Sequence, residues 1–250
     1  MSDFKTHLSA ACAGSGLAAT TVLLTGTGRP SELFLYFVIG IIGGILPDID
    51  ADQSVPIRLI FDFLAPVIAF PVVFSRSAGC SVAELFILWI AAFLTIRYFV
   101  RAVFTYFTVH RGSIHSIPAA ILFGLATTIL LNRVFIFSDA TAWAGGCFVF
   151  FGFIIHLILD ELNSLKVSKM RVKKSFGTAL KLGTGNLRIT ILLYIAIVAM
   201  LSLTPDSRTF IATFSNKNYY LHIRFFPEGQ WFESLSEKIG LSEREVRIEK

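Results

Sequence analysis

Long apolar stretches constrain the fold of this 250-residue chain more than any other feature. A helix that crosses a bilayer needs roughly 17–25 mostly apolar residues, and a water-soluble core of this size could not bury so many such stretches. Apolar residues make up 54% of the chain and charged residues only 16%, against about 25% charged residues in an average soluble domain. The sequence therefore predicts an all-α, polytopic transmembrane helical bundle, and it excludes a disordered chain and an ordinary soluble enzyme.

Seven apolar stretches can be marked along the chain, and we expect about five to seven of them to form helices. The third stretch contains Asp62, Pro66 and Pro71, which predict a kink or partial insertion. The apolar core of the first is long and no Ala-x-Ala cleavage site follows it, which favours a retained helix over a signal peptide. The stretches cover residues 8–28, 32–46, 56–74, 82–109, 114–131, 143–162 and 187–203.

Charge predicts the domain organisation and the orientation of the chain. We expect a membrane-embedded domain over residues 1–205, which includes a basic loop at 161–186, and a small polar tail over 206–250 whose residues 242–245 read as a helix capping box. Basic residues concentrate in cytoplasmic loops, so the basic loop predicts a cytoplasmic location. The same rule accounts for the net charge of +5, and nucleic-acid binding is not expected.

Polar side chains gather at three places in this apolar sequence. Such residues are informative, because inserting an aspartate at the centre of a membrane-spanning helix costs about 2.5–3.5 kcal/mol. An acidic pair follows the second stretch, a histidine pair surrounds a Gly-Ser turn after the fourth, and a His-x-x-x-Asp pair in the sixth puts two side chains on one helix face. If each stretch crosses the membrane once, all of these residues lie on the cytoplasmic side. With an upstream histidine, they are His7, Asp48, Asp50, His110, His115, His156 and Asp160.

Four histidines and three aspartates on one side of a membrane favour a metal site. Imidazole and carboxylate ligands suit zinc, with manganese as the alternative. Seven ligands exceed the four of one tetrahedral ion, so the count also admits two ions that share a bridging aspartate. Each element alone has a structural explanation, because Asp-x-Asp after a helix often caps the next one. Cys12, Cys80 and Cys147 form no CxxC pair, so neither a disulfide framework nor a thiolate site is expected.

Three arginines are candidates for binding a substrate phosphate. Arg97 and Arg101 lie four residues apart in the fourth stretch, and they either hold a phosphate or pair with an acid such as Asp62 or Glu84. Arg111 lies between the two histidines of the second cluster and is the better candidate.

The motifs Pro-Asp-Ile-Asp (47–50), His-Arg-Gly-Ser-Ile-His-Ser (110–116) and His-x-x-x-Asp (156–160) occur in this order after His7. In this respect the chain resembles the YdjM-like family of bacterial inner-membrane proteins, to which metal-dependent hydrolysis is attributed. The resemblance covers roughly residues 7–163 and implies a multi-pass membrane protein in which the seven histidines and aspartates are metal ligands. After Asp160 the chain departs from the family pattern, because a basic loop replaces the Gly-containing turn that members often have.

The sequence thus leads to the hypothesis of an integral membrane metal-dependent hydrolase near the cytoplasmic face of the bacterial inner membrane. Asp50 or Asp160 is expected to bridge ions or act as a general base, Asp52 to support a ligand histidine or to face solvent, and Arg111 to stabilise developing negative charge. A site at the membrane surface favours a lipid-linked ester or phosphoester as substrate. Two alternatives stay open: an ion or metal transporter, and a non-enzymatic membrane regulator with a structural metal site. The sequence makes no prediction of oligomeric state.

Overall fold

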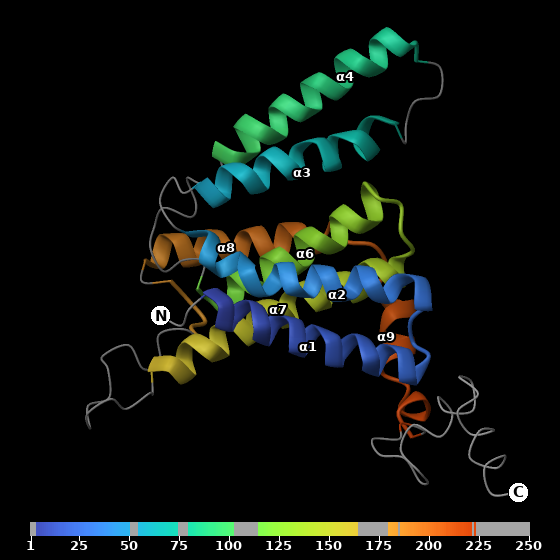
Figure 1. Cartoon of the computed structure of the whole chain (residues 1–250), viewed down its shortest axis with the longest axis vertical. Helices are drawn as coiled ribbons and strands as arrows, with labels where there is room; N and C mark the ends of the chain where they lie inside the picture. Colours follow the sequence, from blue (N-terminus) through green and yellow to red (C-terminus); the bar gives the residue numbers. More distant parts are fainter. Residues whose placement is uncertain are drawn as a thin grey trace, which may run out of the picture. The chain divides into compact units, whose positions relative to one another are not determined.

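The structure, a computed structural model, describes residues 4–50, 55–74, 80–102, 115–164, 180–184, 186–221 and 223 (Figure 1). These residues form helices and connecting turns and contain no strand, which confirms the predicted all-α fold. The chain divides into two compact units, Met1–Asn216 and Lys217–Lys250. The helices of the first unit are α1 (Phe4–Thr25), α2 (Pro30–Ile45), η1 (Leu46–Asp50), α3 (Val55–Phe74), α4 (Val82–Leu94), η2 (Thr95–Val100), α6 (Ile117–Arg133), α7 (Asp139–Ser164), α8 (Leu187–Leu201) and α9 (Arg208–Phe214), and the second unit begins with η3 (Lys217–Tyr219).

The observed helices coincide with the predicted apolar stretches. Four helical segments are long and apolar enough to cross a membrane, namely Phe4–Thr25, Pro30–Asp48, Val82–Val100 and Asp139–Asn163. Three further apolar helical segments are shorter, namely Leu64–Phe74, Ile117–Arg133 and Leu187–Leu201. The described part of the chain therefore contains seven apolar helical segments, at the upper end of the predicted range.

Helices α3 and α4 pack against each other as a pair. The third stretch is helical from Val55 to Phe74, through both Pro66 and Pro71. Helix α4 continues into the π-helical turn η2. There the Arg97 Nε atom lies 2.9 Å from the Asp62 carboxylate of α3.

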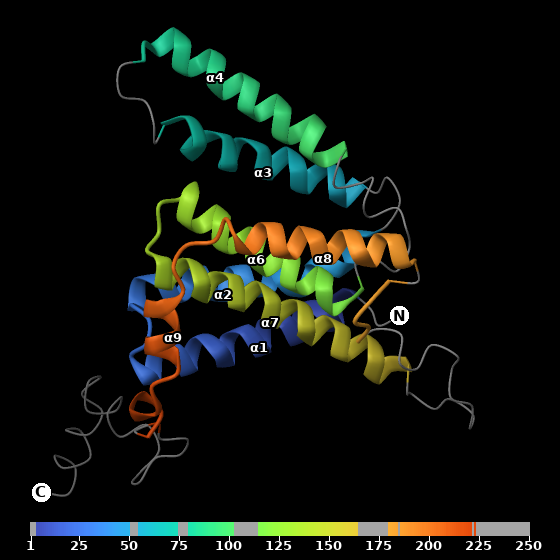
Figure 2. The ribbon, with the colours of Figure 1, turned by 180° about the vertical axis from the view of Figure 1, so that it is seen from behind.

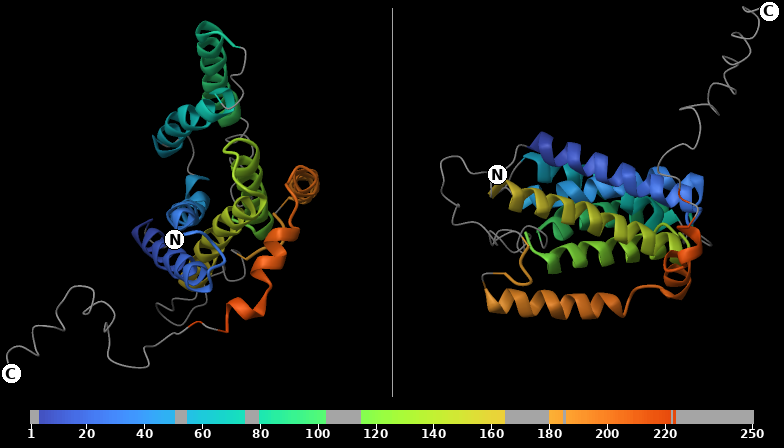
Figure 3. Two further views of the ribbon diagram at one scale, coloured as in Figure 1. Left: turned by 90° about the vertical axis from the view of Figure 1, so that its right-hand side faces the viewer. Right: turned by 90° about the horizontal axis from the view of Figure 1, so that it is seen from below.

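Helix α7 is the central helix of the remaining bundle. It packs against α1, α2 and α6, and α8 lies along α6, as Figures 2 and 3 show from behind and from two further sides. More than half of the apolar window of α7 is buried, whereas α1 and α2 bury about a quarter of theirs. Its uniformly apolar sequence is therefore explained by packing on several sides as well as by a lipid environment.

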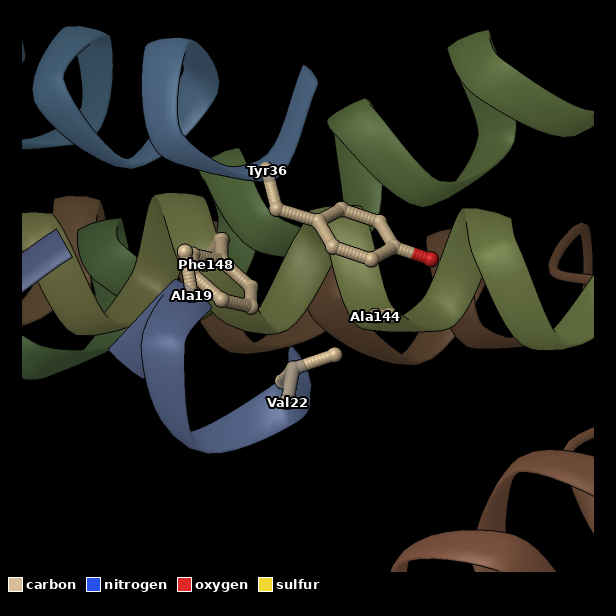
Figure 4. Close-up of a cluster of buried hydrophobic side chains, with 5 residues drawn as sticks. All are labelled: Ala19, Val22, Tyr36, Ala144 and Phe148. Atoms are coloured by element: carbon tan, nitrogen blue, oxygen red, sulfur yellow. The ribbon is translucent and has the colours of Figure 1, made fainter. Parts of the chain in front are cut away.

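An aromatic cluster fixes α1, α2 and α7 relative to one another. The rings of Tyr36 and Phe148 stack with their centroids 5.1 Å apart, and Ala19, Val22 and Ala144 complete the cluster (Figure 4). The first part of the predicted polar tail also joins this core, because Phe210 and Phe214 of α9 pack against the cluster.

Glycines bring the backbones of α2 and α7 into direct contact. A Cβ atom at Gly152 of α7 would collide with the carbonyl oxygen of Gly40, and a Cβ atom at Gly43 would collide with the backbone of Val149. Small residues at a helix crossing allow such close approach in membrane bundles. The C-terminal half of α2 is consequently held against the middle of α7.

Candidate metal centre

The candidate metal centre lies at one end of the bundle. There α1 and α6 begin and α2 and α7 end, where the blue start of α1 lies beside the yellow end of α7 in Figures 1 and 3. His7 lies in the first turn of α1 and Asp48 in η1, directly after α2. His115 lies two residues before α6, whose start is fixed by the side chain of Ser116 accepting a hydrogen bond from the Ala119 N–H.

His156 and Asp160 complete the set from α7, one helical turn apart on the same face. The structure thus brings together five of the seven predicted ligands from four segments of the sequence: His7, Asp48, His115, His156 and Asp160. They form two overlapping groups that share His156, and the ligand atoms within each group lie within 4.8 Å of one another.

Asp160 lies among all three described histidines. Its Oδ1 atom is 3.3 Å from His7 Nε2, and its Oδ2 atom is 3.4 Å from His156 Nε2 and 3.6 Å from His115 Nε2. The Asp48 Oδ1 atom also lies 3.6 Å from His156 Nε2.

The imidazole rings are packed closely. The rings of His7 and His156 stack with centroids 3.8 Å apart, and the His115 ring lies edge-on to His156. His7 and His156 are almost completely buried, whereas the side chains of Asp48, His115 and Asp160 are 24%, 21% and 17% exposed. The cluster therefore has a buried histidine side and a side that solvent can reach.

The hydrogen bond of His156 shows which of its two ring nitrogens is available to bind an ion. Its Nδ1 atom lies 2.8 Å from the Gly44 carbonyl oxygen. A carbonyl oxygen only accepts, so Nδ1 carries a proton and Nε2 is the nitrogen whose lone pair is available to an ion. Among the described residues Nε2 has no hydrogen-bond partner, although two carboxylates lie within 3.6 Å. A lone pair facing two anions is stabilised by a cation between them.

The distances between the donor atoms fit such a cation. Zinc binds nitrogen and oxygen ligands at about 2.0–2.2 Å in tetrahedral geometry, which places neighbouring ligand atoms about 3.3–3.6 Å apart. The four nitrogen-to-oxygen distances around Asp160 and His156 lie between 3.3 and 3.6 Å. The donor bond from His156 to a backbone carbonyl is also the usual support of a metal-binding histidine. The described residues therefore fit a divalent ion that accepts nitrogen and carboxylate ligands.

The electrostatics of His115 favour the form that binds metals. Burial lowers the pKa of His115 below its usual value, and the neighbouring His156 adds to this effect, while the carboxylates of Asp160 and Asp48 oppose it. The net lowering keeps the His115 imidazole neutral at pH 7, and only the neutral ring can donate a lone pair to an ion.

Several predicted residues lie outside the part of the chain that the structure describes. His110, Arg111, Asp52 and the capping box at 242–245 lie there, and the backbone of Asp50 is described within η1 but its side chain is not. Their assignments stay predictions from the sequence.

The two remaining arginine candidates are engaged with groups of their own helix pair. Arg97 pairs with Asp62, which was the structural alternative to phosphate binding, and its guanidinium also lies over the Phe93 and Tyr98 rings. The guanidinium of Arg101 lies over the Tyr98 ring.

The sequence did not indicate that Gly44 contributes to this cluster. Its contribution is a backbone carbonyl, which no side-chain motif reveals. The available signal is the pattern Gly40-x-x-x-Gly44, which is typical of helices that pack closely in membranes. That pattern predicts a close crossing but does not say which carbonyl meets a histidine.

Comparison with known proteins identifies the family of the chain. No curated protein and no solved structure match the chain. The YdjM inner membrane protein family matches residues 1–224, so the match includes all seven predicted ligands and extends past residue 163, where we expected the resemblance to end. A match over most of the chain, together with several apolar helices, identifies a multi-pass membrane protein. The chain therefore belongs to the YdjM inner membrane protein family.

Proposed function

We propose that this protein is an integral membrane metal-dependent hydrolase. The observation that supports the proposal best is the environment of His156, whose buried Nε2 lone pair faces Asp48 and Asp160 on the side of the cluster that solvent can reach. A divalent zinc ion held there activates water and polarises an ester or phosphoester.

Histidine and aspartate ligands have different roles in this proposal. Nε2 is the only lone pair that His156 has available, so His156 binds one ion and the two overlapping groups cannot each use it for a separate ion. Asp160 has two oxygens, one towards His7 and the other towards His115 and His156, and it can therefore bridge two ions. With Asp160 as the bridge, we propose Asp50 as the general base, one of the two roles that the sequence left open for it, and Arg111 as stabiliser of developing charge.

We place the site near the cytoplasmic side and assign a lipid-linked ester or phosphoester as substrate. The ligands lie at helix ends instead of mid-helix positions, and the basic segment 161–186 follows directly after Asp160. A site at that depth is reached by the headgroup of a lipid while its acyl chains stay in the bilayer. A transporter would need its polar residues nearer the membrane midplane.

A purely structural metal site is the second candidate, because the ligands come from four segments and an ion would tie them together. Structural zinc sites are closed by four protein ligands, whereas catalytic sites keep a position open to water. The partial exposure of Asp48, His115 and Asp160 favours the open type.

The test combines metal analysis with turnover on detergent-purified protein. We expect one to two equivalents of zinc or manganese by mass spectrometry, and hydrolysis of at least one member of a panel of phospholipids and lipid-linked phosphates that stops on chelation and returns with metal. Asp160→Asn should lose bound metal and most of the activity, whereas Asp206→Asn, an exposed aspartate outside the site, should change neither. Turnover that continues in metal-stripped protein would contradict the proposal, and full metal content without turnover of any substrate would favour the structural role.

A further inference from the structure

Lys181 lies next to the candidate metal centre although it is far from the ligands in sequence. Its carbonyl oxygen accepts a hydrogen bond from the Ile117 N–H at 2.9 Å. Ile117 is the first residue of α6 and follows His115 by two positions, so their Cα atoms are at most about 7 Å apart. In the sequence, Lys181 stands out only as one cation of the basic loop that predicts the topology.

The backbone around Lys181 is held at further points. The Tyr194 hydroxyl donates to the Leu182 carbonyl oxygen at 2.8 Å, and the Thr184 N–H donates to the Thr190 hydroxyl at 2.8 Å. Both partners belong to α8. The segment is therefore fixed between the start of α6 and the first half of α8, and this fixes where Lys181 leaves the backbone.

The positive charge of Lys181 is not balanced by a carboxylate in the described part of the chain. The residue is half-buried, and its ammonium group forms no ion pair with any residue that the structure describes. Without a carboxylate partner among these residues, the positive charge of the ammonium group is not compensated by the protein. An anionic ligand would supply that compensation.

The surroundings of Lys181 also favour an anion. The N-terminal ends of α1, α6 and α8 lie at the end of the bundle where the candidate metal centre lies, and each carries a partial positive charge (Figure 3). A divalent ion among Asp48 and Asp160 would offset the two negative charges of the described ligand set. Helices α2 and α7 end there and contribute partial negative charges, so three N-terminal ends face two C-terminal ends.

We propose that Lys181 binds the phosphate group of the substrate and so makes the site selective for phosphoesters over neutral esters. This inference rests on the proposed hydrolase function and specifies its substrate class. The ammonium group forms a charge-assisted hydrogen bond to a phosphate oxygen, which orients the phosphate towards the ligands on α7. Either a lipid headgroup or a soluble phosphate compound can present this group.

The experiment measures phosphate binding to zinc-loaded protein by calorimetry, with bound zinc determined in parallel for every variant. One arm titrates inorganic phosphate into protein in detergent. The other uses protein in nanodiscs of phosphatidylcholine, with and without phosphatidic acid, and follows binding by the shift in unfolding temperature. Lys181→Gln should weaken phosphate binding about tenfold or more at unchanged zinc content, and Lys181→Arg should retain most of it. Arg188→Gln, which removes an exposed cation from the first turn of α8, should bind phosphate like the original protein.

The outcomes separate this inference from the proposed function. Binding in both arms supports recognition of the phosphate group itself, and binding only with phosphatidic acid supports a lipid headgroup as its source. Zinc-loaded Lys181→Gln that binds phosphate as tightly as the original protein would overturn the role of Lys181 but leave the metal centre intact. Zinc-loaded original protein that binds phosphate in neither arm would also overturn it. Original protein that takes up no zinc would overturn the proposed function, and this inference with it.

Discussion

His156 Nδ1 donates a hydrogen bond to the carbonyl oxygen of Gly44 at 2.8 Å, across the crossing of α7 and α2. The bond sets the orientation and the tautomer of the imidazole, and thereby points Nε2 at Asp48 and Asp160. It forms only because glycines let the two backbones approach each other closely. The packing of two helices thus controls the chemistry of a side chain that belongs to only one of them.

Widening this helix crossing should disrupt the metal centre without changing any ligand. In Gly152→Ala the new methyl group collides with the Gly40 carbonyl, and overpacking of this kind costs about 1–3 kcal/mol. We expect a lower unfolding temperature and less bound zinc, measured by scanning fluorimetry and mass spectrometry. The matched control is Gly16→Ala in α1, where the nearest atom to the new methyl is 3.7 Å away, in Phe37. Normal zinc content in Gly152→Ala would show that the crossing does not position His156.

Removal of the metal should destabilise the protein. Without an ion, the Asp48 and Asp160 carboxylates both face the His156 lone pair, and part of the free energy of unfolding is lost. We expect chelation to lower the unfolding temperature and added zinc to restore it. The double variant Asp48→Asn/Asp160→Asn replaces both carboxylates by neutral amides and so removes this repulsion. Chelation should therefore change its unfolding temperature much less. Equal unfolding temperatures of metal-loaded and stripped original protein would contradict this prediction.

The metal-free protein should lose stability as the pH falls below about 6.5, the ordinary pKa of histidine. The folded state lowers the pKa of His115, so the unfolded chain takes up a proton at this residue at higher pH than the folded protein does. The stabilisation is complete above that pH and declines as the pH falls towards the lower pKa of the folded state. Unfolding in denaturing detergent between pH 5 and pH 8 measures the slope, and His115→Gln should reduce it. An unchanged slope in that variant would assign the effect to other groups.

The ion pair between Asp62 and Arg97 should stabilise the α3–α4 pair. The two side chains are about one third exposed, so we expect a coupling free energy of about 1 kcal/mol and not the larger values of fully buried pairs. A double-mutant cycle with Asp62→Leu and Arg97→Leu measures it, because the double variant should be less destabilised than the sum of the single variants. Strictly additive effects would show that the pair contributes nothing. Zinc content should be unchanged in all three variants, since neither residue belongs to the described ligand groups.

The sequence by itself determined the class of fold and the positions of the helices. Long, predominantly apolar stretches such as 8–28 and 143–162 have no stable alternative to helices, because only a helix satisfies the backbone hydrogen bonds of a single segment within lipid. The sequence also indicated which polar residues matter, since a residue such as Asp160 is costly in an apolar segment unless it has a partner or a function.

Only the tertiary structure decided how these residues meet. The roles of the Gly44 carbonyl, the His7–His156 stack and Lys181 beside the start of α6 all depend on how pairs of helices cross. Likewise, Arg97 had two open interpretations in the sequence until the packing of α3 on α4 placed Asp62 beside it. Apolar periodicity fixes which residues are helical, but an ion discriminates between donor positions that differ by a few tenths of an ångström. Such distances are set by side-chain packing and glycine contacts between segments more than 100 residues apart, as Gly44 and His156 are.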